Sequence, residues 1–172
     1  ALYQGALTSD VPLLLITHDT PTALKLEQEL LSLSNHENEL PICLFPDWET
    51  LPYDTFSPHQ DIISQRLATL YQLSRMENGI VIVPVTTLAQ RLAPKKYIEA
   101  NSLIINKGDK KELHQVRQEL ESCGYRCVDQ VMEHGEFSAR GAILDIFPMG
   151  SNTPFRLDLF DDEIDEIRLF DP

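Results

Sequence analysis

The stretch Ile80-Val81-Ile82-Val83-Pro84-Val85 decides the fold of the first half of this chain. It is apolar at every position, which is typical of a strand buried on both faces of a parallel sheet. Two further runs, Val11–Ile16 and Pro41–Phe45, have the same apolar character, and the first is too continuous for a half-exposed strand. The sequence therefore predicts three buried strands of one sheet.

Helical patterns lie between and after these strands. Thr20 is placed to cap a helix whose first residue is Pro21, and leucines follow at intervals of three to four residues. A short helix is predicted from Thr86 or Thr87 to Leu92. A longer one is predicted over residues 62–76, with an apolar face made by Ile63, Leu67, Leu70 and Leu73. Strands that alternate with helices indicate an α/β fold with a parallel sheet covered on both faces, which we assign to residues 1–101.

The pattern changes in the second half of the chain. Ser102–Asn106 is predicted to be a strand, and Asp109 with Glu112 matches an N-terminal capping pair for a helix. Gly124 is a suitable residue to end that helix. Beyond Tyr125 no helical period is present, and we expect three or four strands. Residues 102–172 are therefore predicted to form a small α+β domain.

The clearest turn in this second domain is Gly150–Pro154. It is predicted to join Ala139–Phe147 to Phe155–Phe160 as an antiparallel hairpin. Because side chains alternate between the two faces of a strand, the apolar residues of the second strand face the core. The opposite face then carries Arg156, Asp158 and Phe160, and Arg140 is placed to join it.

Arginine and aromatic side chains on a polar face are residue types enriched in the hot spots of protein interfaces. The alternation alone leaves a second interpretation open. In that alternative Phe160 turns inward and Arg156 pairs with Asp158, a surface contact worth about 0–1 kcal/mol.

The overall charge bears on the class of partner. The 172 residues include 14 basic and 27 acidic side chains, which gives a formal net charge of −13. So acidic a surface repels the phosphate backbone, and we expect no direct nucleic-acid binding by this segment. A protein partner with basic patches fits better, although acidity that only keeps the domain soluble remains an alternative.

Composition also predicts the compartment. No apolar run approaches the roughly 20 residues that span a bilayer, and no secretory signal is recognisable, so we expect no membrane contact. Three cysteines without paired spacing are typical of free thiols in a reducing cytoplasm. The first and last residues are expected to be cuts through a longer protein.

A search for catalytic motifs predicts none. The sequence holds no phosphate-binding G-x-x-x-x-G-K-[ST] loop, no HExxH or CxxC metal motif and no G-x-S-x-G nucleophile elbow. The loop Thr17–Thr20 lies where a strand leads into a helix, but it has no glycine or lysine, which disfavours nucleotide binding. The acidic run Asp161–Glu166 lacks the spacing of a calcium loop. We therefore expect no catalytic residue, no cofactor and no metal.

Two stretches carry a resemblance to a known family. Phe137–Pro148 and Phe155–Pro172 resemble the UvrA-binding domain of the UvrB-like excision-repair proteins, with the same order of Arg-Gly, Ile-Phe-Pro, Phe-x-Asp-Glu-Ile and Phe-Asp-Pro. Three further segments are similar to one branch of that family, the bacterial transcription-repair coupling factors: residues 48–58, 59–67 and 130–136. The room between Pro58 and Arg66 is too short for the long hairpin with which UvrB grips DNA.

The resemblance implies a fold and a role. Residues 1–101 would be a degenerate P-loop or RecA-like domain of UvrB type, followed by a UvrA-binding α+β domain over 102–172. The segment would act as an adaptor that recruits UvrA in transcription-coupled repair, without catalysis, through contacts made by Arg140, Arg156 and Phe160. RNA polymerase and double-stranded DNA would be bound by other domains, which hold the ATP-dependent motor. Two alternatives stay open, namely a trimmed ATP-dependent UvrB-like enzyme and an intramolecular regulatory domain.

Overall fold

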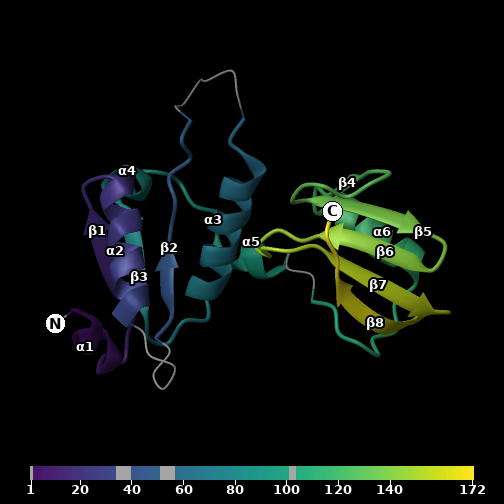
Figure 1. Cartoon of the computed structure of the whole chain (residues 1–172), viewed down its shortest axis with the longest axis horizontal. Helices are drawn as coiled ribbons and strands as arrows, with labels where there is room; N and C mark the ends of the chain where they lie inside the picture. The colour runs from purple at the N-terminus through teal and green to yellow at the C-terminus, as the bar shows by residue number, and fades with distance from the viewer. Residues whose placement is uncertain (1, 34–39, 51–56, 101–103) are drawn as a thin grey trace. The chain divides into compact units, whose positions relative to one another are not determined.

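The chain is a mixed α/β protein with two compact units. The computed structural model describes residues 2–33, 40–50, 57–100 and 104–172. The units are Ala1–Ile98 and Glu99–Pro172, and each is described by itself below (Figure 1). The domain boundary predicted between residues 101 and 102 lies outside the described residues. None of the helices in the described ranges is long and apolar enough to cross a membrane.

The first unit is built on a parallel sheet of three strands in the order β1-β3-β2. The central strand, β3 (Ile80–Pro84), is buried at every position, as its apolar run predicts. β1 (Leu13–Thr17) and β2 (Ile42–Leu44) pair with it on either side. The remaining elements are helices, namely α1 (Leu2–Leu7), α2 (Thr20–Leu33), α3 (Gln60–Leu73), α4 (Val85–Leu88) and α5 (Lys95–Ala100), which crosses the boundary between the units.

Alternate side chains of β3 enter two separate cores. Ile80 and Ile82 pack with α2 residues such as Leu30, whereas Val81 and Val83 pack with Phe45 and the α3 residue Leu70. Helices therefore cover both faces of the central strand (Figure 1). This arrangement explains why β3 has no polar residue.

The prediction that β1 is fully buried is wrong. Leu14 is 50% exposed and Ile16 is 57% exposed, and only alternate residues of the strand turn inward. β1 lies at an edge of the sheet, and the core beneath α3 takes its buried residues from β3 and Phe45 but none from β1. A continuous apolar run thus marks an edge strand here, not a central one.

Two helix starts also differ from the sequence prediction. Asp19, not Thr20, caps α2, because its carboxylate accepts a hydrogen bond of 2.8 Å from the Thr22 amide. α3 begins at Gln60, and His59 Nδ1 accepts from the Asp61 amide at 3.3 Å. The predicted short helix to Leu92 is the four-residue α4.

The predicted leucine face of α3 is only partly buried: Leu70 packs against the core of Val81 and Val83, but none of the predicted residues is among the fully buried ones. The buried residues of α3 are Ser64, Arg66 and Thr69, whereas Leu73 is exposed. Thr69 Oγ1 donates to the Leu44 carbonyl at 3.0 Å, so a polar contact joins the helix to β2. The fully buried part of the helix is therefore polar, and it includes Arg66, whose guanidinium lies against the rings of Phe45 and Trp48.

The second unit is a five-stranded sheet in the order β4-β5-β6-β7-β8, packed against one helix. β4 pairs with β5 in parallel, and the other pairs are antiparallel. α6 (Leu113–Ser122) packs on the sheet through Val116 and Leu120. The strands are β4 (Arg126–Cys127), β5 (Glu136–Arg140), β6 (Ile143–Phe147), β7 (Phe155–Phe160) and β8 (Glu163–Leu169).

Local expectations for this unit are partly confirmed. The three or four strands predicted after Tyr125 are wrong in number, because five are present among the described residues 126–172 and the shortest, β4, has only two residues. The antiparallel pairing across Gly150–Pro154 is present as β6 and β7, with Leu144 opposite Leu157. The predicted strand Ala139–Phe147 is in fact the end of β5 and all of β6, separated by Gly141, whose φ of 61° forms a tight turn. Gly124 ends α6 with a φ of 87°.

Two predictions at the start of the second unit are wrong. Ile104–Asn106, the described part of the predicted strand, belongs to no strand. Asp109 does not cap α6, because its carboxylate accepts from the Asn106 amide at 2.8 Å. Glu112 is the N-cap residue, and its side chain makes no capping hydrogen bond.

Candidate protein interface

The outer face of the second sheet carries the residues that alternation singled out. On β7, Leu157 and Leu159 are buried in the core. Arg156 and Asp158 lie on the other face, and Phe160 at the end of the strand is 75% exposed. The alternative in which Phe160 turns inward is therefore wrong. A phenyl ring this exposed is an apolar surface that a protein partner can cover.

A loop covers one end of this outer face. The Glu136 carboxylate accepts hydrogen bonds of 2.9 Å from the amides of Met132 and Glu133, and Ser138 Oγ donates to the Asp129 carbonyl. These bonds hold the loop across the first half of β5 and bury Glu136 and Ser138. Arg140, at the far end of β5, lies beyond the loop, and its side chain is 65% exposed.

The pairing register brings Arg140 and Arg156 to the same carboxylate. Asp145 on β6 lies directly opposite Arg156 on β7, so the two side chains share a face. Arg156 Nε and Nη2 donate to the two Asp145 oxygens at 2.6 and 2.7 Å, a bidentate pair. Arg140 Nη2 lies 4.0 Å from Asp145 Oδ2. The hydrogen bonds to Asp145 raise the pKa of Arg156 above its usual value.

The alternative pairing of Arg156 with Asp158 is also wrong. Asp158 is instead paired with Arg168, its diagonal neighbour on β8, which lies directly opposite Arg156. The Arg168 guanidinium also lies 3.6 Å from Glu166. Arg156 has a different further neighbour, since its guanidinium carbon lies 5.1 Å from the centre of the Phe170 ring.

Together these residues form a surface suited to bind protein, which we call the arginine–phenylalanine surface (Arg140, Arg156 and Phe160). A guanidinium has five N–H donors, and Asp145 uses two of those on Arg156. The other donors can meet an acceptor on a partner, and the Arg156 side chain is 36% exposed. Exposed arginine side chains on the same face as an exposed aromatic ring match the composition of an interface hot spot.

Asp145 and Phe170 are the site residues that sequence reasoning missed. Asp145 had a signal, because it lies between Leu144 and Ile146 in a strand and therefore points away from the core. Its position opposite Arg156 depends on the strand register, which the sequence alone left open. Phe170 follows the last strand, where no alternation assigns a face.

No group of acidic, histidine or cysteine side chains that could hold a metal ion is found in the described part of the chain. The acidic run Asp161–Glu166 begins as a turn, with Asp161 at a φ of 55°, and continues into β8. Its side chains at Asp161, Asp162 and Glu163 are exposed.

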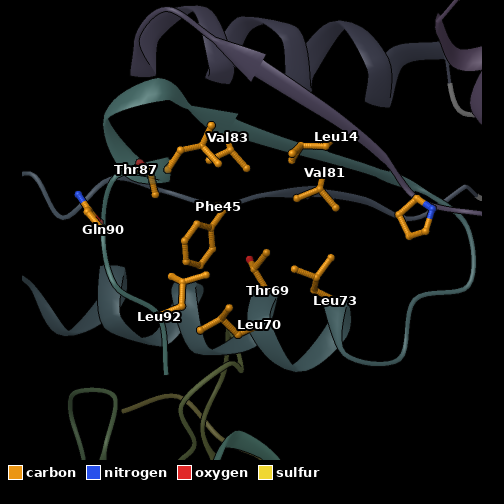
Figure 2. A pocket seen from close by; sticks show the side chains of 12 residues that line it. Leu14, Phe45, Thr69, Leu70, Leu73, Val81, Val83, Thr87, Gln90 and Leu92 are labelled. Atoms are coloured by element: carbon orange, nitrogen blue, oxygen red, sulfur yellow. The ribbon is translucent and has the colours of Figure 1, made fainter. Parts of the chain in front are cut away.

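The first unit holds an apolar cavity of about 320 Å³ (Figure 2). It lies between α3 and the sheet, and Phe45, Leu70 and Val83 are among its walls. Thr87 Oγ1 and Gln90 Oε1, also at the cavity, are buried without a hydrogen-bond partner among the described residues. The described residues that line the cavity include no charged side chain, so it offers a space for apolar groups and no group for acid–base chemistry.

Comparison with known proteins defines the class first. Residues 103–172 match the sequence model of the family described as the UvrB interaction domain. The second unit is therefore a UvrB interaction domain, in agreement with the resemblance drawn from its Arg-Gly and Ile-Phe-Pro motifs.

Relatives of nearly the whole chain are transcription-repair-coupling factors. The Haemophilus influenzae protein of that name is 56% identical over 91% of this chain, and the Escherichia coli protein is 52% identical over 93%. The Bacillus subtilis protein is 33% identical over 99%. The chain spans 13–14% of the length of these relatives. It belongs to the transcription-repair-coupling factor family and is homologous to one segment of its members.

Proposed function

We propose that this chain is the module by which a transcription-repair coupling factor recruits UvrA during nucleotide excision repair in the bacterial cytoplasm. The observation that carries the proposal is the arginine–phenylalanine surface on the outer face of a UvrB interaction domain. In this role the segment binds protein and performs no catalysis. RNA polymerase and double-stranded DNA are bound by other parts of the full-length factor.

Each residue of the surface has a defined task in this proposal. Arg140 and Arg156 donate hydrogen bonds to carboxylates on UvrA, and Phe160 enters an apolar pocket. Arg156 is already held by Asp145 in the unbound chain. Fixing a long side chain before binding removes part of the entropy cost of association, about 0.5–1.5 kcal/mol for each immobilised side chain.

The first unit is proposed to be a degenerate RecA-like domain of UvrB type. Its parallel sheet with helices on both faces supports this assignment. The loop after β1, where an active P-loop protein binds phosphate, is occupied by its own contacts. Thr17 Oγ1 donates to the Asp19 carbonyl, and the Asp19 carboxylate caps α2. An acidic cap in this position disfavours a phosphate.

The test is a calorimetric titration of the 172-residue chain with purified UvrA. Wild type is expected to bind, and Phe160→Ala is expected to weaken binding while leaving the fold intact, because 75% of Phe160 is already exposed. Burying the exposed part of the Phe160 ring against a partner is worth about 1–2 kcal/mol, which corresponds to roughly 5- to 30-fold in affinity. Arg140→Ala and Arg156→Ala are expected to weaken binding at least as much.

Met132→Ala is the matched control for this titration. Met132 is also an exposed apolar residue, but it lies in the loop at the opposite end of β5 from Arg140. Its substitution is expected to change the affinity less than about threefold, since surface substitutions away from an interface act weakly. Wild-type affinity in all three surface variants would rule out the assigned surface, and no binding by the folded wild-type chain would rule out the recruiting role.

A further inference from the structure

Asp145 is an unusual residue for the middle of a sheet. It lies on β6, with β5 on one side and β7 on the other, and only 4% of it is exposed. A carboxylate is costly to bury unless it is paired and hydrogen-bonded. Asp145 meets this condition with Arg156 at 2.6 and 2.7 Å, and Arg140 lies 4.0 Å away. One buried anion therefore organises two cations of the outer face.

The choice of donor atoms fixes the orientation of Arg156. Nε and Nη2 form the side fork of the guanidinium, and both are used by Asp145. The Phe170 ring, 5.1 Å from the guanidinium carbon, adds a second restraint. The end fork, made of Nη1 and the second hydrogen of Nη2, is left for another acceptor. A planar carboxylate matches this fork with two parallel hydrogen bonds.

We propose that Asp145 is a positioning residue for UvrA binding: it holds the end fork of Arg156 ready for a carboxylate on the partner and keeps Arg140 beside it. This inference rests on the proposed function, since it names the chemistry of the partner at the same surface. The partner residue that meets Arg156 is an Asp or Glu, approached end-on. Asp145 itself touches no partner atom in this mechanism.

The test compares Asp145→Asn with Glu136→Gln in the 172-residue chain. Glu136 is a matched control, because it is also a buried carboxylate on the outer face and is paired with an arginine, Arg126, at 3.0 Å. It lies at the end of β5 remote from Arg140.

The two substitutions should have different effects on affinity. Asparagine is isosteric with aspartate but presents an amide group to Arg156, so at most one of the two hydrogen bonds survives. Asp145→Asn is therefore expected to lower UvrA affinity about three- to tenfold, because Arg156 must then lose its freedom of movement when the partner binds. Glu136→Gln is expected to lower it less than about threefold, because it disturbs no residue of the arginine–phenylalanine surface.

A second measurement follows Arg156 without any partner. In ¹⁵N nuclear magnetic resonance spectra of the free chain, the Arg156 Nε–H group is expected to be ordered and slow to exchange with water. In Asp145→Asn it is expected to become mobile and fast to exchange, while in Glu136→Gln it is unchanged. This measurement shows whether Asp145 orders Arg156, and the affinity of the same variant shows whether that order contributes to binding.

The outcomes separate this inference from the proposed function. If wild type does not bind UvrA, the proposed function fails, whereas the resonance of Arg156 still tests whether Asp145 positions it. The positioning role is overturned if Asp145→Asn binds like wild type, if Arg156 stays ordered in that variant, or if Glu136→Gln loses as much affinity. Should Asp145→Asn fail to fold, Arg156→Lys, which has no fork to orient, replaces it, and wild-type affinity in that variant overturns the role equally.

Discussion

Arg66 is a charged residue that the first unit buries, and its removal should be among the costliest single changes there. Only 3% of Arg66 is exposed. Its guanidinium carbon lies 4.2 Å from the centre of the Phe45 ring and 4.1 Å from that of Trp48, and Nη1 donates to the Pro46 carbonyl. Burial lowers the pKa of Arg66, while the negative charge of Asp47 acts in the opposite direction.

The magnitude follows from these contacts. A hydrogen bond from a charged group contributes about 1.5–3 kcal/mol, and a desolvated cation–π contact contributes up to about 2 kcal/mol. The contributions overlap, so we expect Arg66→Ala to lower the free energy of unfolding by about 3–4 kcal/mol. Arg75 supplies a matched control on the same segment, because it stacks on Tyr71 at 4.4 Å but is exposed. Arg75→Ala should cost about 0.5 kcal/mol or less.

The assay uses the single tryptophan of the chain, Trp48, as a reporter. Because its ring contacts Arg66, its fluorescence reports on the first unit during urea denaturation. With a slope of about 1–1.5 kcal/mol per molar urea for a unit of this size, the midpoint should fall by about 2 M or more in Arg66→Ala. A midpoint shift no larger than that of Arg75→Ala would refute the reasoning.

Three further predictions concern single positions. Burial raises the pKa of the Cys43 thiol, and its Sγ donates a hydrogen bond to Gln72. An aromatic disulfide reagent should therefore react quickly with the exposed Cys123 and Cys127 but slowly with Cys43 until urea unfolds the chain. Gly79→Ala should cost about 2 kcal/mol and Gly141→Ala about 1 kcal/mol in urea titrations, because both have positive φ but only the former places a Cβ 2.7 Å from a backbone atom, the Pro41 carbonyl oxygen. Hydrogen bonds from Thr22 hold the pKa of the Asp19 carboxyl below its usual 3.8. The ionised carboxylate therefore stabilises the folded chain at neutral pH, and this stabilisation is lost as the pH falls through the lowered pKa. Thermal melts should therefore show a loss of stability in Asp19→Ala at pH 7 that shrinks as the pH is lowered below the usual aspartate pKa of 3.8.

Much of the fold was predictable because burial and alternation leave simple patterns. The run Ile80–Val83 has no polar residue, and it is the central strand. The same argument failed for Val11–Ile16, since an apolar run does not reveal how far a neighbouring helix extends across the sheet. It was incomplete for α3, where Leu70 of the predicted face packs against the core but the fully buried residues are Ser64, Arg66 and Thr69. A charged residue counts as polar in any pattern of hydrophobicity, although its stem and planar head can pack like an apolar group.

The candidate surface was predictable to the level of a face but not of its contacts. Period-two alternation placed Arg156 and Phe160 away from the core, and the structure agrees. Which carboxylate meets Arg156 depends on register, and register is set by turns. The predicted strand ran on through the tight turn at Gly141, so Asp145 had no assigned partner. The role of these residues in binding UvrA stays a prediction until the titration is done.

The exposed side of β1 has a practical consequence for handling this protein. Leu14 and Ile16 present apolar side chains on an edge strand, and among the described strands only β3 pairs with it. Edge strands of this kind can associate with a second molecule through their free backbone groups. Concentrated samples should therefore self-associate at this edge. Ile16→Lys should raise solubility, because the added charges repel each other when two edges pair.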